Sequence, residues 1–293
     1  MTKIIIFRIA VFTIFILISY LLSANYQDLI GFTLVLSVGL VHGANDLLII
    51  KRNSKSTYYN QFRIFSTYIG VVFLGLIFFY FFPSFALIVF ILVSIYHFGE
   101  QHIESIPINI NLKKNYRVIS FLSHGIILFT IIFLNNIDIV NNVFLSFKIK
   151  FLNYNTLNVI LFASSIIYLC TLVINKYLTS FIFSEILFFV LFYYLSLSST
   201  LILCFSVYFI FFHSILSIKD QIKYIYGSND LKSLKSYLLN SMPYFIMALI
   251  FLFLFYNYTE IDNTNILPII FTFLAAITFP HVIVIEKMYR SMK

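Results

Sequence analysis

Six histidines are the residues of this sequence best suited to chemistry, and the four strongest candidates, each inside a long apolar segment, are His42, His97, His213 and His281. An ionisable side chain in a hydrocarbon region is costly, so it is a functional candidate by default. Neutral imidazole is a good ligand for iron, copper, zinc and nickel. The sequence therefore predicts a metal centre built from histidines on separate helices. Metal sites of this kind are common in the cores of helical bundles. The alternative for each single histidine is a hydrogen bond to a neighbouring helix.

Polar residues follow these histidines at helical spacing. Asp46 comes four residues after His42, Glu100 comes three after His97, and Ser217 comes one turn after the third histidine. Residues three or four apart share one face of a continuous helix. A metal-bound imidazole usually donates its other N–H to a carboxylate, a carbonyl or water. We therefore expect Asp46 and Glu100 to orient ligand rings, with Ser217 close to the site.

Other polar and aromatic residues in the apolar segments are weaker candidates. His102 and His124 lie near segment ends, and Glu185 either pairs with a tyrosine or serine of a neighbouring helix or has a functional role. The aromatic residues around the histidines are more often core packing, although they also suit a pocket for a long apolar ligand. The candidates for such a pocket are Tyr96, Phe98, Tyr208, Phe209 and Phe212.

The amino-acid composition indicates which class of protein carries these residues. Of 293 residues, 61% are apolar and 10% are charged, and the mean hydropathy is +0.98. Ordinary soluble domains are about 45–50% apolar and about 25% charged. The composition excludes a soluble globular enzyme, a disordered protein and a nucleic-acid-binding module. Two cysteines inside apolar runs support neither a disulfide framework nor a cysteine metal site.

The apolar segments predict a polytopic bundle. About 20 apolar residues span a bilayer as a helix, and we expect one all-α membrane-embedded domain over residues 1–293, without a soluble domain. A count of eight or nine helices stays open because the fourth segment is short and follows Pro83 at once. The ten candidates are Ile4–Leu22, Leu29–Ile50, Ile64–Phe82, Ser84–Phe98, Val118–Leu134, Thr156–Ile174, Ser180–Leu195, Thr200–Ile218, Pro243–Tyr258 and Ile266–Ile285.

The basic residues predict the orientation of the bundle. With ten helices and a cytoplasmic N-terminus, all of the 19 basic residues except Lys148 and Lys150 fall on the inner side. Lysine and arginine collect in cytoplasmic loops, so we expect both termini in the cytoplasm and a multi-pass protein of the cell inner membrane. In this topology all six histidines fall in the inner half of the membrane.

Two segments allow more than one interpretation. Lys3 and Arg8 precede an apolar stretch that resembles a signal peptide, but the stretch is longer than a usual signal core, which favours a retained helix. In Asp230–Ser241 the leucines fall on one helical face, which predicts a separate helix in the cytoplasmic interface.

Four short motifs resemble those of a known family. The sequence His42-Gly43-Ala44-Asn45-Asp46 resembles the Pro-His-Gly-x-x-Asp signature of the Brp/Blh family, the bacterial and archaeal membrane β-carotene 15,15′-dioxygenases. The stretch from Tyr96 to Glu100, Phe212-His213-Ser214 and Pro280-His281 are similar to further motifs of that family, in the same order. Together they cover most of the chain.

The resemblance implies an integral membrane enzyme that uses non-haem Fe²⁺ and O₂ to split lipid-dissolved β-carotene into two retinal molecules. It implies His42, His97 and His213 as iron ligands, and a retinal-binding membrane protein as a receiver of the product. Ser217 stands where the family has a further histidine. Either His281 or water completes the coordination, or the iron site is altered.

Two other functions remain open. A transporter also uses intramembrane histidine and carboxylate side chains, although its polar helices often form an internal repeat, and no convincing one is visible here. A family member with altered catalysis is the second, because of Ser217. A di-iron desaturase is disfavoured because no two of the six histidines are adjacent.

Overall fold

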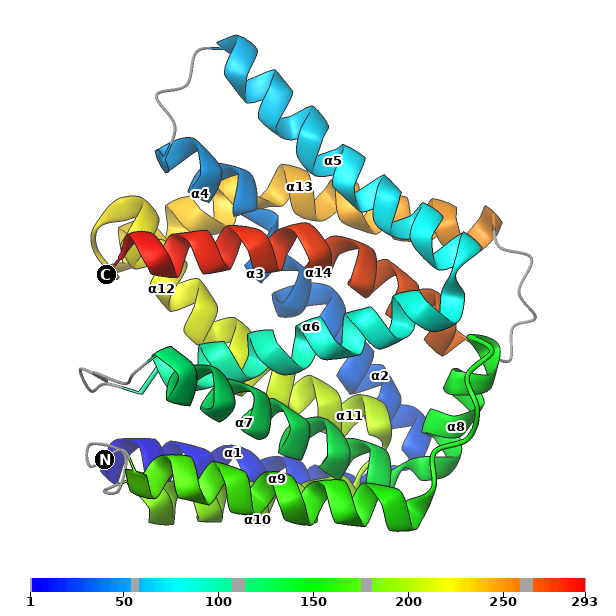
Figure 1. The fold of residues 1–293 in the computed structure, drawn as a ribbon. Coiled ribbons are helices and arrows are strands. Elements are labelled where there is room, and N and C mark those ends of the chain that lie inside the picture. Colours follow the sequence, from blue (N-terminus) through cyan, green and yellow to red (C-terminus); the bar gives the residue numbers. More distant parts are fainter. Residues whose placement is uncertain (1, 54–57, 107–113, 175–180, 259–265, 293) are drawn as a thin grey trace. The chain divides into compact units, whose positions relative to one another are not determined.

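The computed structural model describes residues 2–53, 58–106, 114–174, 181–258 and 266–292 (Figure 1). Within these ranges the regular structure is helical and strands are absent. The chain is an all-α polytopic membrane protein, as predicted. Nine segments of the described residues are long and apolar enough to cross a membrane: Thr2–Leu21, Ala24–Arg52, Phe62–Phe81, Pro83–Glu104, Tyr116–Asn135, Tyr154–Ile174, Leu201–Tyr226, Leu231–Asn257 and Leu267–Ser291.

All ten predicted segments coincide with helices, and nine of them correspond to these nine spans. The remaining one, the seventh (Ser180–Leu195), coincides with the shorter apolar helix α10 (Ile182–Ser198). Helix α6 (Pro83–Glu104) continues past the predicted end at Phe98 because the polar residues of its last turns are buried in the protein. His102 therefore lies within α6. The prediction of a separate interfacial helix was wrong, since that segment is the start of α13 (Leu231–Tyr258), which continues through Pro243.

The loop charges that the orientation rests on include Lys55, Lys176, Glu260 and Asp262, which lie outside the described residues. The cytoplasmic placement of both termini stays a prediction.

The chain divides into two compact units, and each is described by itself. The first comprises Met1–Val35, Ser94–Leu145 and Lys150–His213, and the second comprises Leu36–Val93, Ser146–Ile149 and Ser214–Lys293. The single domain expected over residues 1–293 also stays a prediction.

The first unit is held together by three helix pairs. Helix α7 (Lys114–Asn135) packs against α9 (Tyr154–Ile174), α1 (Thr2–Leu21) against α10, and α11 (Leu201–Val207) against α2 (Ala24–Leu34). Helix α8 (Ile137–Ser146) follows α7.

Two glycines bring the backbones of α6 and α7 together. A Cβ atom at Gly99 would collide with the carbonyl of Phe121, and one at Gly125 would collide with the carbonyl of Ile95. Small residues allow membrane helices to approach this closely. The crossing lies within one turn of His97 on α6, so it fixes the position of that ring.

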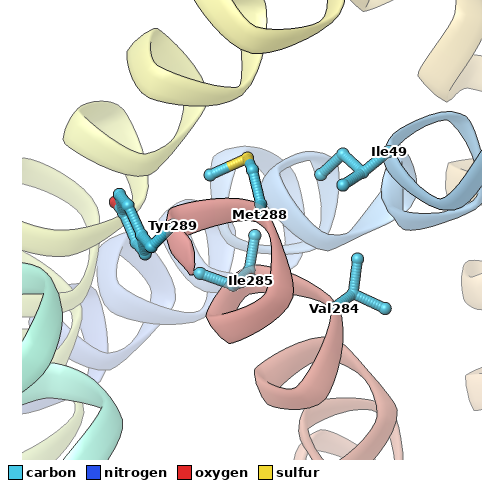
Figure 2. Packing of buried hydrophobic residues seen from close by; sticks show 5 residues of the cluster. All are labelled: Ile49, Val284, Ile285, Met288 and Tyr289. Carbon is cyan, nitrogen blue, oxygen red and sulfur yellow. The ribbon is translucent and has the colours of Figure 1, made fainter. Parts of the chain in front are cut away.

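The second unit packs around α14 (Ile266–Ser291). Helix α5 (Tyr58–Phe81) and α4 (Asp46–Asn53) lie against α14, while α3 (Leu40–Ala44) packs on α13 and α12 (Ile215–Tyr226). Figure 2 shows the apolar cluster that joins α4 and α14, to which α4 contributes Ile49 and α14 contributes Val284, Ile285, Met288 and Tyr289. Burial of these side chains fixes α14 against the short helix α4.

Helix α13 begins with a side-chain cap. The carboxylate of Asp230 accepts the backbone N–H of Ser233 at 2.7 Å. This hydrogen bond lowers the pKa of the exposed Asp230 carboxyl below its ordinary value. An N-terminal cap stops the helix from fraying at its first turn.

Local irregularities occur at two of the predicted metal ligands. A π-helical segment, η1 (Val35–Gly39), ends three residues before His42, and a second one, η3 (Tyr208–Ser214), contains His213. Such segments are rare and occur frequently at functional sites. A third irregularity is Asn45, whose φ of −98° and ψ of 11° interrupt the helix between α3 and α4.

Candidate metal centre

The second unit brings His42 of α3 and His281 of α14 together. Their ring centroids are 4.6 Å apart and the rings are nearly perpendicular. Both side chains are buried. The two histidines are 239 positions apart in the sequence numbering, and their approach depends on the packing of α14 against α3.

Each ring of this pair has its Nδ1 nitrogen on an oxygen atom. His42 Nδ1 donates to the carbonyl of Gly39 at 2.6 Å. His281 Nδ1 lies 2.9 and 3.1 Å from the two carboxylate oxygens of Asp46, and the Tyr68 hydroxyl donates to the same carboxylate at 2.8 Å. Because the oxygens accept, Nδ1 carries the proton, and Nε2 is the nitrogen that each ring would offer to a metal.

The structure corrects the partner expected for Asp46. The spacing of four residues predicted that Asp46 orients His42, and this was wrong because Asn45 interrupts the helix between them. Asp46 orients His281 instead, and His42 uses the carbonyl of Gly39 at the end of η1. Tyr68 was missed, because a tyrosine in an apolar helix gives no signal in the sequence.

Ser217 reaches His42 through another side chain. Gln221 donates from Nε2 to the Ser217 hydroxyl at 3.0 Å and to the backbone carbonyl of His42 at 2.9 Å. The Tyr237 hydroxyl donates to Gln221 Oε1 at 2.8 Å. This buried network fixes the backbone at His42. Gln221 and Tyr237 were not singled out in the sequence, since neither residue type is unusual in a helix.

The first unit brings His97 of α6 and His213 of η3 together. Their ring centroids are 4.8 Å apart, edge to face, and both side chains are 1% exposed. Glu100 is buried one turn after His97 on the same helix. Both histidines of this second pair therefore lie in the protein interior.

The five predicted aromatic residues do not form a single cluster. Phe98 and Phe209 lie against the His213 ring, with centroids at 4.6 and 5.6 Å. Phe212 and Tyr208 pack around Phe188 in the core. The fifth residue, Tyr96, meets Phe121 edge to face. The structure thus places Phe98 and Phe209 beside a predicted metal ligand.

A separate charged cluster lies within the first unit. The ligand-type atoms of His102, His124 and Glu185 lie within 4.8 Å of one another, all buried. Glu185 accepts from Arg8 at 2.7 Å, from His102 at 2.9 Å and from Tyr168 at 2.8 Å. The tyrosine partner expected for Glu185 is thus confirmed.

The contacts of Arg8 identify this cluster as an ion pair. Its guanidinium also donates to the carbonyl and hydroxyl oxygens of Ser184 at 2.7 and 2.8 Å and lies over the Phe188 ring. The arginine neutralises the only carboxylate of the cluster, which makes the cluster a buried ion pair and a poor site for a further cation. Nothing in the sequence indicated this pairing, because Arg8 resembles an ordinary flanking charge of a first helix.

Each histidine pair offers imidazole donors, which suit iron as well as copper, zinc and nickel. Neutral imidazoles leave a divalent ion its charge, and a His-rich set with few ligands leaves positions for O₂. The oxygen partners of His42 and His281 are those that metal-bound histidines usually have. The residues present therefore suit a non-haem metal centre.

Comparison with known proteins supports the same interpretation. Neither the curated proteins nor the solved structures provide a match. Among protein families, the model of the β-carotene 15,15′-dioxygenase family matches residues 33–289. The matched range contains both histidine pairs and Asp46, but it does not include Arg8. The chain belongs to the β-carotene 15,15′-dioxygenase family.

Proposed function

We propose that this chain cleaves β-carotene, or a close carotenoid, with O₂ to form retinal at a non-haem Fe²⁺ held by His42, His97, His213 and His281. The observation that carries the proposal is the buried pair His42 and His281, in which each Nδ1 is held by an oxygen, so that each Nε2 is the nitrogen that a metal ion would take. Family membership supplies the reaction and the substrate class.

The balance of the reaction explains which side chains are needed. The central C15=C15′ double bond breaks, and each of its carbons gains one atom of O₂, so that one β-carotene gives two retinal molecules. The balance requires no added proton or external electron, and the site needs no acid–base pair. Iron would supply the site of O₂ activation. The chain's own residues hold the imidazole rings in place and exclude water through burial.

His281 is proposed as the fourth ligand. The position of the further family histidine is occupied by Ser217, which accepts a hydrogen bond from Gln221. His281 has the acidic partner that a ligand histidine needs, and it lies beside His42. We further propose a location in the cell inner membrane, with retinal passing to a retinal-binding membrane protein.

The proposal is tested by expressing the chain in cells that accumulate β-carotene. The cells are expected to lose their orange colour and to form retinal, and the purified protein is expected to contain iron. Anaerobic cells carrying the same gene are the control and should stay orange. Persistent colour without retinal, in aerated cells that express the protein well, would contradict the proposal.

Replacing Asp46 by asparagine should weaken iron binding by about 10–100-fold, because the amide holds the His281 imidazole less firmly than the carboxylate does. Competition with a chelator measures the affinity. The exposed Asp138→Asn on α8 is the matched control and should leave the affinity unchanged. Equal affinities for the Asp46 variant and the parent would show that this carboxylate does not support a ligand.

A further inference from the structure

The second unit contains a cavity of about 260 Å³ between α3, α4, α5, α13 and α14. Its wall is almost entirely carbon. Its lining includes Gly43, Asp46, Val72, Phe73, Met247 and Ala248.

The size and the lining of the cavity indicate an apolar ligand. Protein interiors pack as densely as organic crystals, so a void of this size is unusual. An apolar cavity of about 150 Å³ stays dry and binds benzene. The cavity here is larger, which allows it to take an apolar ring with substituents.

The cavity adjoins the His42–His281 pair. Gly43 follows His42 directly, and a Cβ atom at Gly43 would lie 3.8 Å from Nδ1 of His281. Asp46, which forms part of the wall, holds the same nitrogen. A ligand in the cavity would therefore lie beside the groups that orient a proposed metal ligand.

Two residues of the wall also reach the outer surface of the unit. Phe73 of α5 is 50% exposed and Met247 of α13 is 39% exposed. Both helices are long and apolar enough to span a membrane, so an exposed face of either meets lipid. A molecule dissolved in the bilayer can reach the cavity without crossing water.

We propose that this cavity binds one cyclic end of the carotenoid, the trimethylcyclohexene ring with its first double bonds, which enters from the bilayer at α5 and α13. The proposal rests on the proposed function for its ligand. The five aromatic residues expected to form a substrate pocket do not line this cavity. The small side chains of Ala248 on α13 and Val72 on α5 then leave the volume that the ring occupies.

The test uses β-ionone, which is the ring without the rest of the polyene, and the purified protein without added O₂. Equilibrium dialysis is expected to show binding to the parent protein and at least about tenfold weaker binding to Ala248→Phe, because the new ring fills the apolar volume. Val72→Phe fills the cavity from α5 and should have the same effect. Ile250→Phe adds bulk to an exposed position of α13 and should bind as the parent does.

The same variants are then assayed with β-carotene. The Michaelis constant is expected to rise in Ala248→Phe and Val72→Phe while the iron content stays constant. Normal β-ionone binding and a normal Michaelis constant in both variants would overturn the proposal, even if the parent forms retinal. A parent that binds β-ionone in this cavity but forms no retinal would support the cavity site and contradict the proposed function.

Discussion

Replacing either His42 or His97 by alanine is expected to abolish bound iron and retinal formation together. Changes to the groups that orient metal ligands typically cost about 10–100-fold in affinity or activity, so removal of a ligand itself should lower the iron affinity by more than about 100-fold. His42 belongs to the pair in the second unit, and His97 belongs to the pair in the first. Metal analysis of the purified variants and measurement of retinal in the expressing cells check the expectation.

The comparison of the two variants tests whether both pairs bind a single ion. If the four histidines share one iron, each single variant loses all of it. If each pair binds its own ion, each variant keeps about half of the iron of the parent, and the shared site is contradicted. His124→Ala is the control, because that ring lies in the ion-pair cluster of the first unit, and it should leave the iron content unchanged.

Replacing Glu185 by leucine is expected to lower the free energy of unfolding by about 3–5 kcal/mol, because it leaves the buried guanidinium of Arg8 without its counter-charge. Arg8→Leu should cost a similar amount. The double variant should cost less than the sum of the two, although it still leaves His102 and Tyr168 without their acceptor. Denaturant titration of the purified protein in detergent measures these free energies.

The matched control is the exposed ion pair between Arg290 and Glu286. Exposed pairs contribute about 0–1 kcal/mol, so Arg290→Leu should change the unfolding free energy by no more than that. Additive costs in the Arg8 and Glu185 variants would show that the two side chains do not stabilise each other.

The sequence by itself determined the helices and their class. In lipid, backbone polar groups must be satisfied within the segment, so an apolar run of sufficient length becomes a helix. This is why each predicted segment, from Ile4–Leu22 to Ile266–Ile285, coincides with a helix. The same rule made His42 and His97 candidates, because an imidazole inside such a run is costly without a role.

Only the tertiary structure decided which polar groups meet. Asp46 contacts His281 across a separation of 235 residues, although its spacing from His42 predicted a different partner. Arg8 and Glu185 meet across 177 residues. Periodicity gives the face of a helix on which a side chain lies, but the partner of that face depends on how the helices pack. The non-helical backbone at Asn45 is enough to put His42 and Asp46 on different faces, although their spacing would place them on one face of a continuous helix.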